Sequence, residues 1–258
     1  MKKTRICIAA TVGLILLSLA PTTNSAATNS TTTESSGYVS ITFDDGTRSI
    51  LDNAIPILDA AKLPSTQYVI TSYLDGHDPN FMNAAEIIRL KAHGHEIGSH
   101  TQLHLFLPSQ SENTVIDELR QSKKDLAEIG ITATTFAYPM GGYNAAVINE
   151  VKRAGYLGAR TTDRGWDGPN LNAYQLKVQN IYPGTTLQTI IGKIDWALHN
   201  RTWVIFVFHN ITPKPAEGGT TTAILKGTVN YLVKQKAHVV TVDQGLRLRR
   251  QLSIPPVR

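Results

Sequence analysis

Short apolar runs alternate with amphipathic stretches along the chain from residue 38 onward. The apolar runs are rich in β-branched and aromatic residues and predict strands at residues 38–43, 66–70, 96–99, 134–138, 156–160, 177–181, 203–208 and 238–242. Apolar residues at helical spacing predict helices at residues 49–62, 83–93, 111–129, 144–154, 187–200 and 221–236. Strands that alternate with helices predict an α/β protein with a parallel sheet or barrel, whose functional groups lie at the carboxyl ends of the strands.

The beginning of the chain has a different pattern. Three basic residues precede an apolar run at residues 6–20, and small residues follow that run. These are the parts of a secretory signal peptide, which we expect at residues 1–26, so that the protein would be secreted to the periplasm, the cell envelope or the medium. An uncleaved anchor is the alternative, although the apolar run is short for a membrane span. Residues 27–37 are mostly Ser, Thr, Asn and Ala, and predict a flexible linker.

Charge and composition exclude several classes of protein. The formal net charge is +5, but loss of the predicted signal peptide would leave 22 of the 25 Lys and Arg against 20 Asp and Glu. Four of these Arg lie at residues 247–258, a basic C-terminal tail that we expect to lie outside packed elements. The remaining domain, residues 38–246, does not have the composition of a nucleic-acid-binding protein. A single Cys excludes a disulfide scaffold, and no stable membrane insertion is expected after signal cleavage.

Two motifs at predicted strand ends carry candidate metal ligands. Asp44 and Asp45 precede Gly46, and adjacent carboxylates raise each other's pKa unless a cation relieves the repulsion; an ordinary Asp-Asp-Gly turn is the alternative. His100 and His104 follow the third predicted strand. On a helical turn, two imidazoles at this spacing share one face. With one of the Asp they supply three ligands and an open position for a catalytic divalent ion, whereas a surface pair is the alternative.

Two further stretches leave predicted strands for the same end of a barrel. The apolar run at residues 203–208 ends in His209, which is either a structural histidine or, at this end of the strand, a functional one. Residues 136–143 leave a strand and enter a turn with Pro and Gly. Turns of this kind can expose backbone N–H groups that bind an anion.

Taken in order, these motifs closely resemble those of the polysaccharide deacetylase (NodB-homology) family, carbohydrate esterase family 4. Thr-Phe-Asp-Asp-Gly at residues 42–46 looks like the first family motif, residues 100–104 fit the H-[ST]-x-x-H pattern, and residues 205–209 are similar to the last motif. The resemblance spans about residues 38–246. It implies a single-domain distorted (β/α) barrel, usually seven-stranded, and a divalent metal, zinc or alternatively cobalt.

The resemblance also implies a role for each residue of these motifs. Asp45, His100 and His104 would hold the metal ion. Asp44 would act as general base toward water, and His209 would protonate the departing group.

The turn after the fourth predicted strand supplies the rest of the implied site. The backbone N–H of Met140 would meet the oxyanion, and Tyr138, Pro139 and Trp166 would line the substrate pocket. Together with Asp44, Asp45, His100, His104 and His209, these complete the predicted set.

The chain departs from the family pattern in two places. Ala137 stands where the family has an Arg that orients the catalytic Asp, and Arg160 and Arg164 are the candidates to replace it. The motif that would supply the acidic residue tuning the catalytic His also departs from the family pattern. Asp163 and Asp167 are both candidates for that role. We interpret Arg160 and Asp163 as candidate orienting residues.

The expected function is that of a secreted, metal-dependent enzyme that hydrolyses N-acetyl groups of an amino-sugar polysaccharide resembling chitin or peptidoglycan. Its partner would be the acetylated polysaccharide and no nucleic acid. An O-acetyl esterase acting on acetylated xylan or a similar glycan is one alternative. A catalytically inactive carbohydrate-binding homologue is the other. Neither the glycan nor the oligomeric state follows from the residues.

Overall fold

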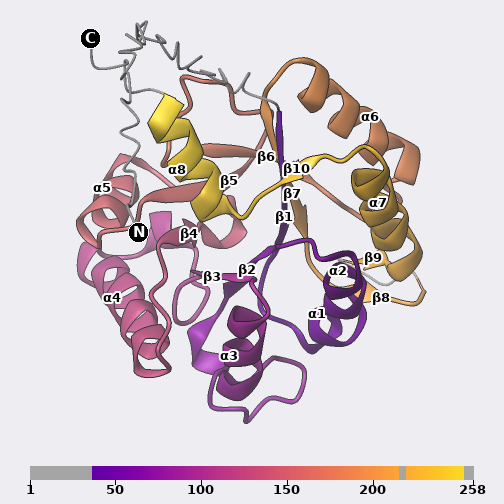
Figure 1. The fold of residues 1–258 in the computed structure, drawn as a ribbon. Coiled ribbons are helices and arrows are strands. Elements are labelled where there is room, and N and C mark those ends of the chain that lie inside the picture. Colours follow the sequence, from indigo (N-terminus) through magenta and orange to yellow (C-terminus); the bar gives the residue numbers. More distant parts are fainter. Residues whose placement is uncertain (1–36, 215–218, 253–258) are drawn as a thin grey trace, which may run out of the picture. The chain divides into compact units, whose positions relative to one another are not determined.

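Seven parallel strands close into a barrel in the computed structural model, which describes residues 37–214 and 219–252 (Figure 1). In barrel order they are β1 (Tyr38–Phe43), β2 (Thr66–Val69), β3 (Glu96–Ser99), β4 (Thr135–Ala137), β5 (Gly158–Arg164), β6 (Leu176–Asn180) and β7 (Trp203–Phe208). Pairing of β1 with β7 along the whole of β1 closes the barrel, and β10 (His238–Val239) adds to the start of β1. The predicted single-domain (β/α) barrel is confirmed.

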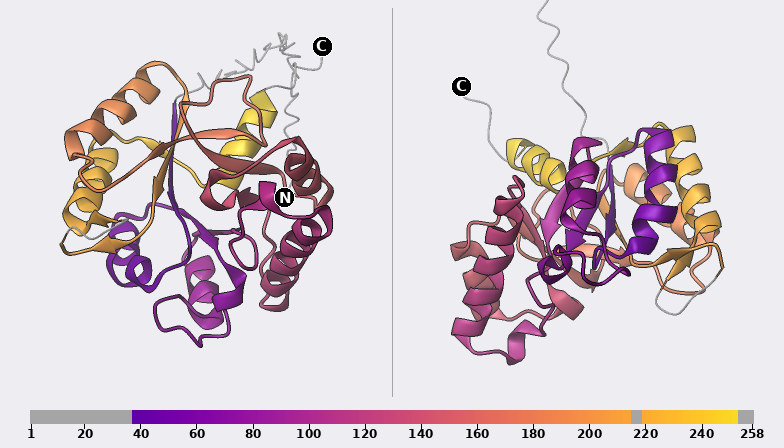
Figure 2. Two further views of the ribbon diagram at one scale, coloured as in Figure 1. Left: turned by 180° about the vertical axis from the view of Figure 1, so that it is seen from behind. Right: turned by 90° about the horizontal axis from the view of Figure 1, so that it is seen from below.

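Helices surround the barrel, as the two further views show (Figure 2). They are α1 (Arg48–Asn53), α2 (Ile55–Ala61), α3 (Ala84–Ala92), α4 (Glu112–Glu128), α5 (Ala145–Arg153), α6 (Leu187–His199), α7 (Thr222–Lys234) and α8 (Val242–Leu252). Three short 3₁₀ turns, η1 (Thr71–Tyr73), η2 (Leu107–Ser109) and η3 (Pro139–Gly141), and the small pair β8 (Ile211–Thr212) and β9 (Thr220–Thr221) lie in the connections. None of these helices is long and apolar enough to cross a membrane, within the described ranges.

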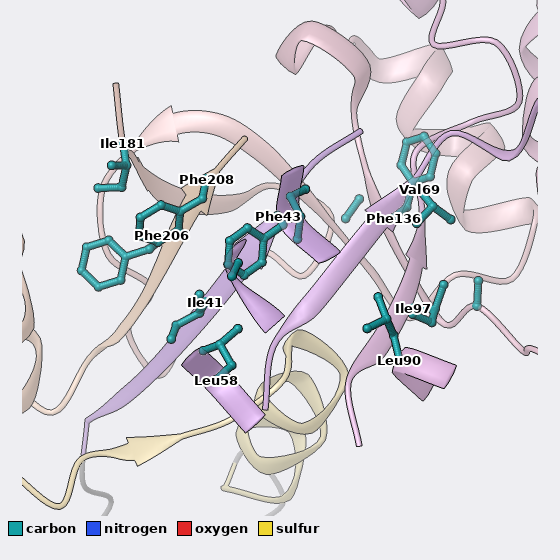
Figure 3. Packing of buried hydrophobic residues seen from close by; sticks show 14 of the residues in the cluster. Ile41, Phe43, Leu58, Val69, Leu90, Ile97, Phe136, Ile181, Phe206 and Phe208 are labelled. Carbon is teal, nitrogen blue, oxygen red and sulfur yellow. The ribbon is translucent and has the colours of Figure 1, made fainter. Parts of the chain in front are cut away.

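The core has two layers because successive strand residues point to opposite faces. In β1 and β7, Ile41, Phe43, Phe206 and Phe208 belong to a cluster that also holds helix residues such as Leu58 (Figure 3). The alternate residues of β7 belong to a second cluster, formed by Tyr68, Leu176, Val178, Trp203, Ile205 and Val207 among others. The apolar runs therefore pack on both faces, as expected for strands of a parallel barrel.

Three predicted elements differ most from the observed ones. The helix expected at 49–62 is divided at Ala54, because Pro56 lies in the first turn of a new helix, where its missing N–H costs nothing. The strand expected at 156–160 is β5, which begins at Gly158 and continues past a register shift to Arg164. The strand expected at 238–242 ends at Val239, and the chain then enters α8.

The expectation that the tail from residue 247 lies outside packed elements is wrong for residues 247–252, which continue α8. Leu246 and Arg249 are buried, the Arg249 guanidinium lies over the ring of Tyr38, and its Nη2 donates to the carbonyl of Arg201. The packed domain thus extends beyond the predicted boundary. The predicted signal peptide, almost all of the predicted linker and residues 253–258 lie outside the described residues.

A buried imidazole at the start of β3 leads to a prediction about acid stability. His95 Nδ1 accepts the N–H of Ser65 (3.2 Å), so its proton lies on Nε2, which donates to Asp59 (3.1 Å). Burial lowers the pKa of His95, although Asp59 acts in the opposite direction. Because the folded pKa lies below the unfolded value, the unfolded state takes up the proton first, and stability falls as the pH drops below about 6.5.

We therefore expect His95→Gln to flatten the loss of stability between pH 7 and pH 5. One proton contributes at most about 1.4 kcal/mol per pH unit to this slope. Urea unfolding at several pH values measures it. His238→Gln is the matched control, since His238 is exposed at the start of β10. Equal slopes in wild type and His95→Gln would contradict the assignment.

Candidate active site

The carboxyl ends of four strands bring together polar residues that lie far apart in the sequence. Asp44 and Asp45 follow β1, His100 follows β3, Arg160 lies in β5 and His209 follows β7. The N–H of Asp44 donates to the carbonyl of Phe208 (3.0 Å), which fixes the end of β1 against the end of β7. Because the strands are parallel, these side chains lie at one end of the barrel, the end at which active sites of such folds form.

Asp45, His100 and His104 form the one group of possible metal ligands found among residues 37–214 and 219–252. Asp45 Oδ1 lies 3.7 Å from His100 Nε2 and 3.6 Å from His104 Nε2. These separations are too long for hydrogen bonds. Zinc binds imidazole nitrogen and carboxylate oxygen at about 2.0–2.2 Å, so a single ion between them can reach all three atoms.

The protonation state of His100 fits a metal ligand. Its Nδ1 donates to the carbonyl of Ala137 (2.8 Å), so the proton lies there and Nε2 keeps a free lone pair. Burial lowers the pKa of His100 to about 4, against the opposing effect of Asp44. The imidazole is therefore neutral at pH 7, which is the form that binds a cation. The donor set fits a divalent metal ion.

The local backbone of this group differs from the prediction. His100 and His104 do not share a helical turn; they lie in a loop after β3. Thr101 and His104 adopt left-handed φ angles of 68° and 59°. The loop folds back on itself, with the N–H of His104 donating to Thr101 Oγ1 (2.9 Å), and the two rings meet with centroids 4.7 Å apart.

Asp44 and Arg160 form a buried ion pair beside the possible metal ligands. Arg160 is 0% and Asp44 3% exposed, and Arg160 Nη2 donates to both carboxylate oxygens of Asp44, at 2.6 Å to Oδ1. Burial alone would raise the pKa of Asp44, but the charge of Arg160, the largest opposing effect, and the hydrogen bond from Arg160 help to hold it below the ordinary value. Arg164, the other candidate, is exposed.

His209 lies beside Asp44 and is partly exposed. Its side chain is 37% exposed, and its Nε2 is 3.9 Å from Asp44 Oδ2. Neither acidic candidate contacts it. Asp163 accepts a hydrogen bond from the hydroxyl of Tyr143 (2.6 Å), and Asp167 accepts the N–H of Lys177 (3.0 Å), while burial raises the pKa of Asp167 to about 7.

The turn after β4 is closely packed against its neighbours. Pro139 is buried, and Tyr138 is buried with its hydroxyl donating to the carbonyl of Tyr174 (3.1 Å). Met140 is 59% exposed with a φ of 53°. At Gly141 a Cβ would lie 2.0 Å from Thr162 Oγ1, and φ is +68°, so only glycine fits there. Met140 is therefore an exposed residue next to a turn position that only glycine can occupy.

Trp166 is not brought to this cluster. Its indole lies against Trp196 of α6, with ring centroids 4.2 Å apart, and Lys193 Nζ is 5.9 Å from its centre. The backbone explains the position. Asp167 exchanges hydrogen bonds with Trp203, at the start of β7, whereas His209 follows the end of that strand. The segment has thus turned back from the carboxyl ends of the strands.

Sequence reasoning missed two supports of the site. The backbone carbonyl of Ala137 accepts a hydrogen bond from His100. It leaves no signal in the sequence, because every residue has a backbone carbonyl. Glu118 does carry a signal: it lies in the buried stripe of α4 with Val115, Leu119 and Ser122, where the helical pattern calls for an apolar residue. Its carboxylate accepts hydrogen bonds from the loop that holds the histidines.

The fold and the site define an α/β-barrel protein with a candidate divalent metal centre and a buried carboxylate beside it. A family model described as polysaccharide deacetylase matches residues 31–159. The chain belongs to the polysaccharide deacetylase family. The matched segment includes Asp44 and the whole metal group, Asp45, His100 and His104; Arg160 and His209 lie beyond it.

A curated relative agrees with this membership, and solved structures share the fold. A poly-beta-1,6-N-acetyl-D-glucosamine N-deacetylase of Staphylococcus aureus is 30% identical over 149 residues, which cover 53% of this chain and 51% of that protein. The chain thus spans about half the length of the curated relatives it matches. A family 4 acetyl xylan esterase from Clostridium thermocellum, solved with cobalt, shares the fold at a TM-score of 0.61 and 20% identity, covering 82% of this chain and 91% of that one. A family 4 pseudoenzyme from Bacillus anthracis also shares the fold, at a TM-score of 0.61 and 14% identity. The match covers 82% of this chain and 66% of that one.

Proposed function

We propose that the protein is a metal-dependent deacetylase that hydrolyses N-acetyl groups of an amino-sugar polysaccharide. The observation that carries the proposal is the Asp44–Arg160 ion pair, which keeps a buried carboxylate ionised next to the Asp45, His100 and His104 group. A buried carboxylate that stays ionised beside a metal group is suited to proton abstraction. The S. aureus relative bears the name of such an N-deacetylase.

In this mechanism Asp45, His100 and His104 would hold the divalent cation, zinc or alternatively cobalt. The cation, when bound, supplies Lewis-acid polarisation of the acetyl carbonyl and acidifies water. Asp44 takes a proton from the attacking water while the water oxygen bonds to the acetyl carbon. Arg160 keeps Asp44 ionised and oriented for this step.

Two further groups complete the reaction. The backbone N–H of Met140 donates to the oxyanion that develops on the carbonyl oxygen. His209 then gives a proton to the amide nitrogen as the C–N bond breaks, so that acetate and a free amine leave. Since an unprotonated amine is a poor leaving group, this proton transfer is worth about 10²–10⁴-fold in rate.

One feature of the site favours a second candidate, hydrolysis of O-acetyl esters. Neither Asp163 nor Asp167 contacts His209, and its imidazole is partly exposed. A histidine without a tuning carboxylate is a weaker acid–base partner, and an ester needs less help because an alkoxide leaves more easily than an amine anion. Acetylated xylan is the representative substrate of this class.

Secretion belongs to the same proposal. Residues 1–26 have the composition of a signal peptide, and polysaccharides that carry acetylated amino sugars are polymers of the cell surface. The partner we propose is therefore an acetylated polysaccharide met outside the cytoplasm.

Acetate release tests the function directly. We expect acetate from β-1,6-linked or β-1,4-linked N-acetylglucosamine oligomers, loss of activity in chelator, and recovery on adding Zn²⁺ or Co²⁺. Mass spectrometry should show the loss of one acetyl group for each acetate released. Preferential release from acetylated xylo-oligosaccharides would select the esterase instead. No acetate from either class, with metal bound, would identify an inactive carbohydrate-binding homologue and reject the proposal.

A further inference from the structure

The segment that carries both metal-site histidines has a backbone that requires external support. It follows β3, and two of its residues, Thr101 and His104, adopt left-handed φ angles of 68° and 59°. Residues other than glycine rarely adopt this conformation unless surrounding contacts impose it. The relative positions of the two imidazoles therefore depend on the groups that hold this loop.

Glu118 of α4 is the charged group that holds it. Its Oε2 accepts the N–H of Gln102 (3.1 Å) and the N–H of Leu103 (2.8 Å), the two residues midway between the histidines. Hydrogen bonds to an ionised carboxylate are stronger than those between neutral groups. One carboxylate oxygen thus fixes the centre of the loop.

The charge of Glu118 has no evident role in the stability of α4. The side chain is only 3% exposed, and among the described residues no Lys, Arg or His forms an ion pair with it. Burying a carboxylate without a cationic partner is costly, and an apolar side chain would suit this stripe of the helix better. The carboxylate is accounted for by the loop whose N–H groups it binds.

A second residue of α4 supports the beginning of the same loop. Ser122 Oγ hydrogen-bonds to Ser99 Oγ (2.7 Å), and Ser99 Oγ accepts the N–H of Thr101 (3.3 Å). Glu118 and Ser122 are four residues apart and so lie on one face of the helix. α4 therefore contacts both the beginning and the middle of the segment that carries the imidazoles.

We propose that Glu118 is a positioning residue for the metal centre. It sets the separation of His100 and His104 through the backbone between them, and its negative charge favours a cation in their neighbourhood. The inference rests on the proposed metal-dependent function. Supports of this kind, one step removed from the ligands, are typically worth about 10–100-fold in metal affinity.

Co²⁺ binding to the full chain tests the proposal, because the visible absorption of Co²⁺ reports ligand geometry independently of activity. We expect Glu118→Gln to raise the Kd for Co²⁺ about 10-fold or more and to change the absorption bands. Glu118→Asp, which keeps the charge but shortens the reach, should have a Kd between those of Glu118→Gln and wild type. The melting temperature of each metal-free variant is measured alongside.

Glu150→Gln is the matched control. Glu150 is also buried, on the neighbouring α5, but its carboxylate pairs with Arg153, so its variant should bind Co²⁺ like wild type. Unchanged Kd and absorption bands in folded Glu118→Gln would overturn the inference and leave the proposed function intact. Failure of both Glu118 variants to fold in excess Co²⁺ would assign the carboxylate to folding and also reject it. A wild-type protein that binds no Co²⁺ would reject the metal-dependent function itself.

Discussion

Asp44→Asn is expected to lower kcat on an acetylated oligosaccharide by about 10²–10⁴-fold while the protein still binds Co²⁺ or Zn²⁺. The amide keeps an oxygen that can accept from Arg160 Nη2, but it cannot take a proton from water. Asp44 is buried in the ion pair, whereas the neighbouring Asp45 has a φ of 71° and faces the two imidazoles. We therefore expect the two carboxylates to have different roles. Metal titration and steady-state kinetics on the same preparation measure both.

Asp45→Asn is the contrasting variant, and it should lose affinity for the metal ion as well as turnover, because a neutral amide oxygen is a weaker ligand for a divalent cation. Asp52→Asn serves as the control, since Asp52 is exposed on α1. Metal affinity equal to wild type in both the Asp44 and Asp45 variants would show that the roles are divided wrongly. Turnover near wild type in Asp44→Asn would remove Asp44 as the base.

Arg160→Ala is expected to destabilise the protein by about 3–5 kcal/mol, the usual cost of removing one partner of a buried ion pair. It should also shift the acidic limb of the kcat/KM profile upward. Burial tends to raise the pKa of Asp44, and Arg160 provides the largest opposing effect. Without Arg160 the base takes up a proton at higher pH.

The pH dependence of stability has a definite sign in wild type. The folded pKa of Asp44 lies below its unfolded value, so its contribution is present at neutral pH and is lost as the pH falls through the acidic range below about 4. Arg160→Ala should lose this contribution. Urea unfolding and the kcat/KM profile are compared with those of Arg164→Ala, whose side chain is exposed on the same strand. An acidic limb that stays in place in Arg160→Ala would leave Asp44 without an orienting residue.

The barrel was predictable because each strand and most helices carry their own local signal. The apolar run at 203–208 and the run at 38–43 each read as a buried strand, and they are β7 and β1 with those same limits. Where the predicted limits of an element were wrong, packing or backbone continuity set the observed limits. α8 continues through the basic residues after Leu246 because Arg249 packs its guanidinium over Tyr38, a contact between opposite ends of the domain.

The sequence by itself determined the alternation of strands and helices, the family to which the chain belongs, and the residue types at the strand ends. Motifs such as Asp-Asp-Gly and the His pair are short, so their spacing is visible in the chain. Only the tertiary structure decided which distant groups meet. Asp44 and Arg160 are 116 positions apart, and no local pattern selects Arg160 over Arg164. Barrel closure buries the first against Asp44 and leaves the second in solvent. The same holds for Trp166, whose place depends on the pairing of Asp167 with Trp203, and for Glu118, whose charge is explained only by the loop folded over it.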